Sequence, residues 1–227
     1  MLLAPERAAV ADAGRRLLAD RLVVGTAGNV SVRAGDLVAV TPTGVRYETL
    51  AAGQVGVHRL GGQPVEASLA PTSELPLHLA VYAATGAAAV VHTHPVAATA
   101  LSCLVQAVPP VHYYTAMFGG PVPVAPYATY GSAELAANAA AALADRTGCL
   151  LANHGAVTVG ASLAQAYDRA VYLEWLCEVA LRVLSTGAPP RLLDDAELAR
   201  VAAKLASYQV MEPTRGQVPR VPPPTVT

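Results

Sequence analysis

Residues 74–95 read ELPLHLAVYAATGAAAVVHTHP, and this stretch decides both the fold and the chemistry of the chain. The apolar segment that opens with a carboxylate predicts a helix, and the β-branched run before the histidines predicts a strand. His92 and His94 lie two residues apart on that strand, so both side chains point to one face and can bind one metal ion. Pro95 cannot donate to a sheet ladder, so the strand ends beside its histidines, at an edge that a substrate can reach.

A third imidazole is offered by His154, in the stretch 150–160, which predicts another apolar strand interrupted by a polar pair and a glycine. Three histidines and one position open to a displaceable ligand are typical of catalytic rather than structural zinc. Glu74 by itself is most simply a first-turn acid that complements the helix dipole. His78, one turn later, is expected to pack or to form hydrogen bonds rather than bind a metal.

Length and charge restrict the class of protein. A chain of 227 residues can form one large domain with a full core, and no central linker favours two domains. Its 15 basic and 16 acidic residues form no basic cluster, which argues against nucleic acid and anionic membranes as partners. No stretch resembles a membrane span, and the first residues lack the pattern of a signal peptide. Three cysteines in apolar surroundings predict buried free thiols and a reducing, cytoplasmic environment, namely Cys103, Cys149 and Cys177.

Spacing and capping signals predict the remaining elements. Helices are expected over residues 5–20, 96–104, 132–146, 162–187 and 194–208. Extended segments are expected over residues 30–33, 37–40 and 107–113, with a hairpin formed by residues 55–60 and 64–67. Thr72 or Ser73 is expected to cap the central helix, and His58, beside a turn, is expected to be solvated.

Three short segments are candidates for binding an anion. Residues 25–33, GTAGNVSVR, combine two glycines with small hydroxyl and amide side chains, although a turn into a strand explains them as well. Residues 41–44, TPTG, form a turn that would contribute Thr43 and the Gly44 amide if the first segment folds beside it. Residues 72–73 lie where unpaired helix amides favour a phosphate.

Several of these blocks resemble one known family when they are taken in order. The blocks are residues 25–33, 41–44, 71–74, 92–94, 112–120, 126–131 and 153–155. Their order and spacing resemble the class II aldolase/adducin family, and most closely its L-fuculose-1-phosphate aldolase branch. The resemblance covers nearly the whole chain, from about residue 5 to residue 208.

The resemblance implies an α/β fold in a single domain, a three-layer sandwich whose central, mostly antiparallel sheet is flanked by helices. That domain would span residues 1–208, leaving residues 209–227 as a Pro-rich tail that is expected to be mobile. The family assembles as a four-fold tetramer with sites at subunit interfaces, so a homotetramer is the expected assembly.

The resemblance also implies roles for the site residues. His92, His94 and His154 match the zinc ligands, and Glu74 matches the carboxylate that moves the proton at the carbon that becomes nucleophilic. Asn29 matches an amide near the enediolate oxygen. The residues that match the pocket for the substrate phosphate are Gly28, Asn29, Thr43, Gly44, Thr72 and Ser73.

Two tyrosines are assigned through the resemblance alone. The aromatic stretch 111–120 does not by itself indicate catalysis, because buried tyrosines mostly serve as core residues. In the family, Tyr113 matches a tyrosine that reaches in from the neighbouring subunit and protonates the aldehyde oxygen. Tyr208 falls where relatives have a tail that can close over the site. Asn153 and Thr93 replace other polar residues of close relatives and would affect the choice of aldehyde.

The implied activity is a zinc-dependent aldolase that reversibly cleaves a ketose 1-phosphate to dihydroxyacetone phosphate and an aldehyde. Cleavage leaves a carbanion, and zinc held by three neutral imidazoles can stabilise the resulting enediolate as a Lewis acid. Glu74 would deliver a proton to that carbon on release of the product. The only lysine, Lys204, lies in the last predicted helix, which argues against a Schiff base.

Other reactions of the same superfamily use the same metal site. Glu74, in place of an aspartate, argues against a pentulose-phosphate 4-epimerase. A methylthioribulose-phosphate dehydratase or a decarboxylase stays open, because both need the same enediolate. A non-enzymatic adducin-like scaffold is disfavoured, because the three histidines and the acid are all present.

Overall fold

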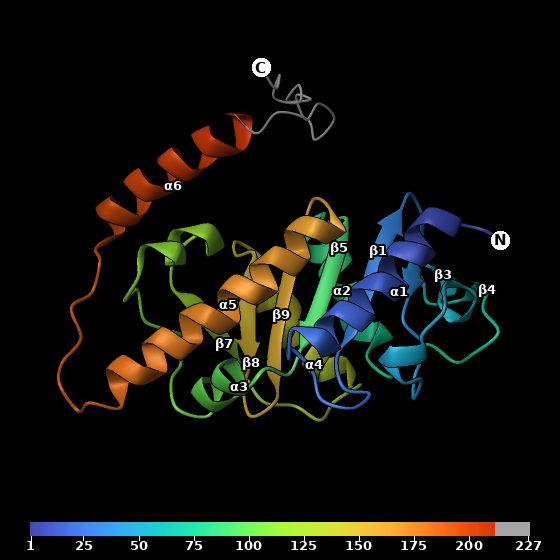
Figure 1. Cartoon of the computed structure of the whole chain (residues 1–227), viewed down its shortest axis with the longest axis horizontal. Helices are drawn as coiled ribbons and strands as arrows, with labels where there is room; N and C mark the ends of the chain where they lie inside the picture. Colours follow the sequence, from blue (N-terminus) through green and yellow to red (C-terminus); the bar gives the residue numbers. More distant parts are fainter. Residues whose placement is uncertain (212–227) are drawn as a thin grey trace, which may run out of the picture.

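A nine-stranded sheet with helices on both faces forms the body of the molecule, in a computed structural model that describes residues 1–211 (Figure 1). Every pair of neighbouring strands is antiparallel except β7 with β8. This arrangement confirms the predicted α/β sandwich with a mostly antiparallel sheet. In their order across the sheet, the strands are β4 (Pro64–Glu66), β3 (Gly56–Arg59), β2 (Leu37–Val40), β1 (Asn29–Ala34), β5 (Ala89–Thr93), β9 (Gly155–Gly160), β8 (Gly148–Leu151), β7 (Val122–Ala125) and β6 (Ala107–Val108).

The helices divide between the two faces of the sheet. Figure 1 shows α1 and α5 on one face, with α2 and α4 behind the sheet, while α6 lies apart from it beside η3. Short 3-10 helices, η1 (Tyr47–Thr49), η2 (Ala52–Gln54) and η3 (Tyr113–Phe118), connect some of the elements. The α-helices are α1 (Ala4–Ala19), α2 (Leu75–Thr85), α3 (Val96–Ser102), α4 (Ala133–Ala142), α5 (Leu163–Leu184) and α6 (Asp195–Met211).

Alternation along the strands fills the two layers between sheet and helices. On β5, Val90 packs with side chains of α2 and α4, whereas Val91 packs with side chains of α1. Asn29 lies opposite His92 in the pairing of β1 with β5, and Ser31 lies opposite Val90. Residues opposite each other in an antiparallel pair share one face, so Asn29, Ser31 and His92 all face the α2 layer.

Two predictions about local structure around the site were wrong. Glu74, rather than Thr72 or Ser73, is the N-cap of α2, because the Thr72 hydroxyl instead accepts a hydrogen bond from the Glu74 amide at 3.2 Å. The stretch 150–160 is a hairpin of β8 and β9 rather than one strand. Asn153 makes the turn with φ 55°, so His154 lies at the tip of the hairpin.

Three further predictions fail away from the site. Residues 107–113 are extended only over β6, because two prolines follow and Tyr113 already opens η3. His58 is buried rather than solvated, and its Nδ1 lies 3.3 Å from the Gly62 carbonyl. Cys103 is exposed at the end of α3, whereas Cys149 and Cys177 are buried free thiols as predicted.

Capping signals placed several helix ends well. Ser132 and Ser162 accept hydrogen bonds from the amides of Leu135 and Gln165, as expected of N-caps. Helix α4 ends four residues before Arg146, and α6 continues past Tyr208 to the last described residue, Met211. The predicted mobility of the tail concerns residues that mostly lie outside the described part of the chain.

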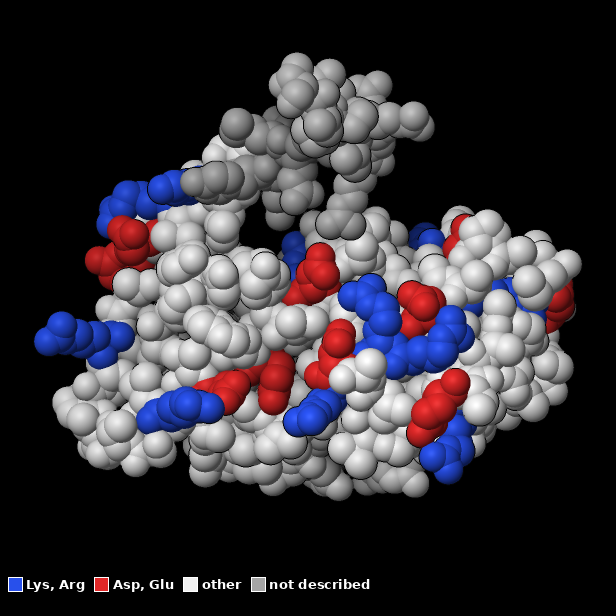
Figure 2. Space-filling view, in the orientation of Figure 1, with Lys and Arg blue, Asp and Glu red and all other residues white. Residues whose placement is uncertain are grey.

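The hydropathy of the helices and the charges on one face of the molecule bear on the expectations from the sequence about membranes and charged partners. Among the described residues, no helix combines the length and the apolar character needed to cross a bilayer. Figure 2 shows acidic and basic side chains side by side on the face formed by α1 and α5.

Candidate active site

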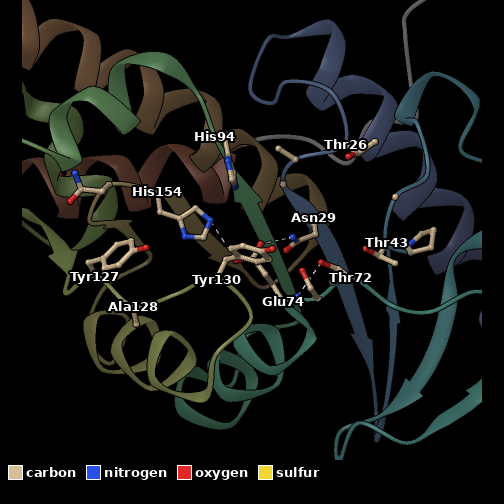
Figure 3. A pocket seen from close by; sticks show the side chains of 16 residues that line it. Thr26, Asn29, Thr43, Thr72, Glu74, His94, Tyr127, Ala128, Tyr130 and His154 are labelled. Carbon is tan, nitrogen blue, oxygen red and sulfur yellow. Dashed lines mark hydrogen bonds and ion pairs between the residues drawn. The ribbon is translucent and has the colours of Figure 1, made fainter.

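Four potential metal ligands converge from three separate parts of the fold, and Figure 3 shows three of them, Glu74, His94 and His154. His92 is the penultimate residue of β5, and His94 directly follows the strand with its backbone amide bonded to the Leu22 carbonyl at 2.9 Å. His154 enters from the β8–β9 turn, and Glu74 enters from the N-terminus of α2. One strand end, one turn between adjacent strands and one helix start therefore place the four side chains together.

The ligand atoms of this cluster lie within 4.8 Å of one another. Nε2 of His92 is 2.8 Å from Nε2 of His94 and 3.0 Å from Oε2 of Glu74. Nε2 of His154 is 3.5 Å from Oε1 of Glu74. The three imidazole rings are mutually edge-on, with centroids 4.7 to 4.9 Å apart. Three ring nitrogens and a carboxylate therefore surround one point.

The protonation of the imidazoles suits a metal. Nδ1 of His92 lies 2.9 Å from the Ala156 carbonyl and must donate to it, which leaves Nε2 to face the cluster. Burial, helped by the charge of His92, lowers the pKa of His94 to about 3 and the pKa of His154 to about 4. Both rings are therefore neutral at pH 7, as metal ligands must be.

The carboxylate of Glu74 also indicates that a cation belongs here. Burial by itself would raise its pKa, but the charge of His92 and hydrogen bonds from His92 and Asn29 hold that pKa well below the usual range. The reciprocal pull of Glu74 raises the pKa of His92 against the effect of burial. Oε1 of Glu74 is buried and accepts no hydrogen bond from the described residues. The donor set thus fits a divalent metal ion.

A cavity of about 510 Å³ opens above the cluster. Of the eleven predicted catalytic, metal-binding and phosphate-binding residues, all but His92 and Tyr113 line it, and His92 is in contact with two that do, His94 and Glu74. The lining residues that the predictions included are Gly28, Asn29, Thr43, Gly44, Thr72, Ser73, Glu74, His94 and His154.

The wall opposite the histidines consists of neutral hydrogen-bond donors. Thr72 and Ser73 line this wall with their hydroxyls, while the amides of Glu74, Leu75 and Leu77 are already hydrogen-bonded within the first turn of α2. Gly28 and Gly44 both have positive φ, 74° and 70°, which turns their loops toward the cavity. None of the described residues that line the cavity is Lys or Arg, so an anion here would be held by dipoles and by the metal.

Tyr113 lies outside the cavity of its own chain. It belongs to η3, is 44% exposed, and stacks with His112 and Tyr114 at ring centroid distances of 4.3 and 4.8 Å. The role of Tyr113 at the site of another subunit stays a prediction.

Sequence reasoning did not assign a role to several residues that complete the site. Tyr127 and Tyr130 line the mouth of the cavity, 61% and 69% exposed, and no local pattern distinguishes them from ordinary loop tyrosines. Glu74, His78 and Tyr82 recur every four residues on one face of an otherwise apolar helix. That spacing was the available signal for a buried polar network leading to Glu74.

Comparisons with known proteins agree with this geometry. The family model of the class II aldolase and adducin N-terminal domain matches residues 8–181. An L-fuculose phosphate aldolase of Escherichia coli O6:H1 is 41% identical over 186 residues, which cover 81% of this chain and 86% of that protein. A 5-methylthioribulose-1-phosphate/5-deoxyribulose-1-phosphate aldolase of Rhodospirillum rubrum is 39% identical over 87% of this chain and 89% of its own.

A solved structure supports the same assignment. An L-fuculose 1-phosphate aldolase superimposes with a TM-score of 0.87 at 33% identity, covering 91% of this chain and 98% of that one. Sequence, fold and cavity therefore agree on one metal-dependent class of enzyme. The chain belongs to the class II aldolase and adducin family, and it is an enzyme of the class II aldolase kind, a carbon–carbon lyase.

Proposed function

We propose that this enzyme reversibly cleaves a ketose 1-phosphate of the L-fuculose 1-phosphate type into dihydroxyacetone phosphate and an aldehyde, with zinc as its metal. The observation that supports this most is the meeting of His92, His94, His154 and Glu74 beneath a cavity walled by neutral anion-binding groups. The substrate is a small sugar phosphate, which this cavity is large enough to admit.

The three histidines would hold the zinc ion. When bound there, zinc supplies Lewis-acid chemistry at the substrate carbonyl, because three neutral imidazoles leave its charge undiminished. His92 is oriented for this by its Nδ1–H bond to the Ala156 carbonyl. Burial keeps His94 and His154 neutral, so neither needs to lose a proton before a metal binds.

Glu74 is the proposed acid and base of the reaction. In the condensation direction its carboxylate takes a proton from the hydroxymethyl carbon of dihydroxyacetone phosphate, and in cleavage it returns that proton. Asn29 donates to Glu74 Oε2 at 2.9 Å and thereby fixes the carboxylate (Figure 3). A carboxylate that is already held in the reactive orientation lowers the activation free energy of proton transfer.

The phosphate of the substrate would lie against the wall opposite the histidines. The hydroxyl-bearing residues Thr72 and Ser73 line that part of the cavity, and the positive end of the α2 dipole favours an anion there. We assign phosphate binding to Gly28, Asn29, Thr43, Gly44, Thr72 and Ser73.

Protonation of the aldehyde oxygen is assigned to Tyr113 of a neighbouring subunit in a homotetramer. The exposure of this side chain on its own subunit and its absence from its own cavity support that assignment. The cell compartment we propose is the cytoplasm, where the buried thiols of Cys149 and Cys177 would stay reduced.

The aldehyde is the least constrained part of the proposal. The relative from Rhodospirillum rubrum favours a second candidate substrate, a 5-methylthio- or 5-deoxyribulose 1-phosphate, cleaved by the same reaction. Tyr127 and Tyr130 stand at the open end of the cavity and would contact whichever aldehyde leaves.

The test is proton exchange of dihydroxyacetone phosphate in heavy water, followed by NMR with zinc-loaded enzyme and with a chelated control. Metal-dependent exchange at the hydroxymethyl carbon is expected, and a screen of aldehydes then identifies the cleaved ketose phosphate. Absence of exchange with zinc bound would reject the aldolase and favour a dehydratase or a decarboxylase.

A further inference from the structure

A buried chain of hydrogen bonds runs from α2 across β1 to the carboxylate of Glu74. The Tyr82 hydroxyl is 2.7 Å from Oγ of Ser31, which is 2.6 Å from Nδ1 of His78. Nε2 of His78 is 2.5 Å from Oδ1 of Asn29, and Nδ2 of Asn29 is 2.9 Å from Oε2 of Glu74. The chain therefore links residues up to 53 positions apart through side chains alone, from Asn29 to Tyr82.

These side chains are closed to bulk water. His78 and Ser31 are 0% exposed, Tyr82 is 1% exposed and Asn29 is 3% exposed. A buried polar atom without a hydrogen-bond partner lowers the stability of the fold. Each of these side chains must therefore find its donor or acceptor among its neighbours in the network.

The chemistry of the groups fixes the direction of every hydrogen bond. A carboxylate oxygen only accepts, so the NH₂ of Asn29 must face Glu74 and the carbonyl of Asn29 must face His78. Nε2 of His78 must then bear the hydrogen, and Nδ1 of the neutral ring must accept from the Ser31 hydroxyl. Ser31 in turn accepts from Tyr82, and all donors point toward Glu74.

Independent features support a neutral His78. Burial lowers the pKa of His78 to about 3, assisted by the charge of His92 and opposed by that of Glu74. A neutral ring has one donor and one acceptor, which matches its two neighbours. Asn29 also lines the cavity, and its second N–H makes no hydrogen bond within the described part of the chain.

We propose that His78 is a positioning residue: its Nε2–H holds the Asn29 amide so that one N–H donates to Glu74 and the other faces the cavity. If the Asn29 amide were flipped, its carbonyl oxygen would face the Glu74 carboxylate and an incoming substrate oxygen. All of these oxygens are acceptors, so they would repel one another. The inference rests on the proposed function of Glu74, to which it adds the group that keeps the base and the neighbouring donor aligned.

The direct test is the tautomer of His78 in protein labelled with 15N-histidine. Long-range 1H–15N spectra should show a neutral ring protonated at Nε2 between about pH 5 and 8, and the signal is assigned by its loss in His78→Gln. An Nδ1–H tautomer or an imidazolium near neutral pH would overturn the inference.

The kinetic test compares two replacements of His78. Phenylalanine keeps a ring but cannot donate, so His78→Phe should lower kcat about 10- to 100-fold with little change in KM and with zinc retained. His78→Gln, whose amide can donate to Asn29, should recover most of this loss. Equal losses in both variants, or no loss in His78→Phe, would contradict the positioning role.

A buried histidine that does not belong to the hydrogen-bond network provides the matched control. His58 is 2% exposed, in β3, and His58→Gln should keep the kcat of the unmodified enzyme. A kcat loss in His58→Gln equal to that of His78→Phe would show that loss of any buried histidine damages the enzyme, and would reject the role of His78.

The tautomer experiment needs no substrate and remains informative if His78→Phe does not fold. Failure of the aldolase proposal would appear as the expected tautomer without turnover, whereas failure of this inference would appear as turnover with another tautomer.

Discussion

A methyl group added at Gly28 should damage the protein much more than one added at Gly35, although both glycines have the same backbone conformation. Their φ angles are 74° and 60°, so an L residue at either position incurs the left-handed penalty of about 1–2 kcal/mol. At Gly28 the new Cβ would lie 2.5 Å from Val23 Cγ1 and 2.8 Å from the His92 carbonyl oxygen. At Gly35 nothing lies within 4 Å.

The expected magnitudes follow from this difference. Overpacking in a tight site typically costs about 1–3 kcal/mol, so Gly28→Ala should lose about 2–5 kcal/mol and Gly35→Ala about 1–2 kcal/mol. Replacing glycine by alanine also raises stability by reducing the conformational entropy of the unfolded chain. This gain is similar at both positions and cancels when the two variants are compared. Because the clash involves the backbone of His92, Gly28→Ala should also displace Asn29 and lower metal affinity.

The assay is urea unfolding followed by circular dichroism, with zinc content measured in parallel. Both variants must be compared at one protein concentration, because assembly would make stability depend on concentration. Equal losses of stability, or unchanged zinc affinity in Gly28→Ala, would refute the claim that close approach of this loop to β5 builds the site.

Three further predictions concern the metal ligand His94, the aldehyde-protonating Tyr113 and the buried His78. His94→Ala should abolish zinc binding and turnover while circular dichroism shows the fold retained; an active variant without metal, by elemental analysis, would refute the site. Tyr113→Phe should slow carbon–carbon cleavage much more than proton exchange, because only cleavage needs the aldehyde oxygen to change protonation; equal slowing would remove Tyr113 from that role. The depressed pKa of His78, about 3 against 6.5, means that the unfolded chain binds more protons between these values. Stability should therefore fall on acidification through this window, by up to about 1.4 kcal/mol per pH unit, and His78→Gln should flatten the slope of urea-derived stability against pH. Identical slopes would show that His78 is not the group responsible.

Local sequence rules determined much of the fold and most of the candidate site. Alternation placed His92 and His94 on one face of a strand, and hydroxyl caps at Ser132 and Ser162 marked the starts of α4 and α5. These rules succeed because side-chain alternation and capping depend on residues only a few positions apart. The residues themselves offered His154 and the anion-binding segments as candidates, and the family resemblance assigned them, with Glu74, to one site; the cavity brings them together.

Only the tertiary structure decided which distant segments face each other. The pairing of β1 with β5 sets Asn29 opposite His92, and the packing of α2 on that face brings His78 to Ser31. The fold also buries His58 and leaves Cys103 exposed, against expectation. Strand order and layer packing come from burying apolar surface over the whole chain, which no local pattern encodes. The sequence by itself therefore determined the chemical groups of the site, and the fold determined the directed network that orients them.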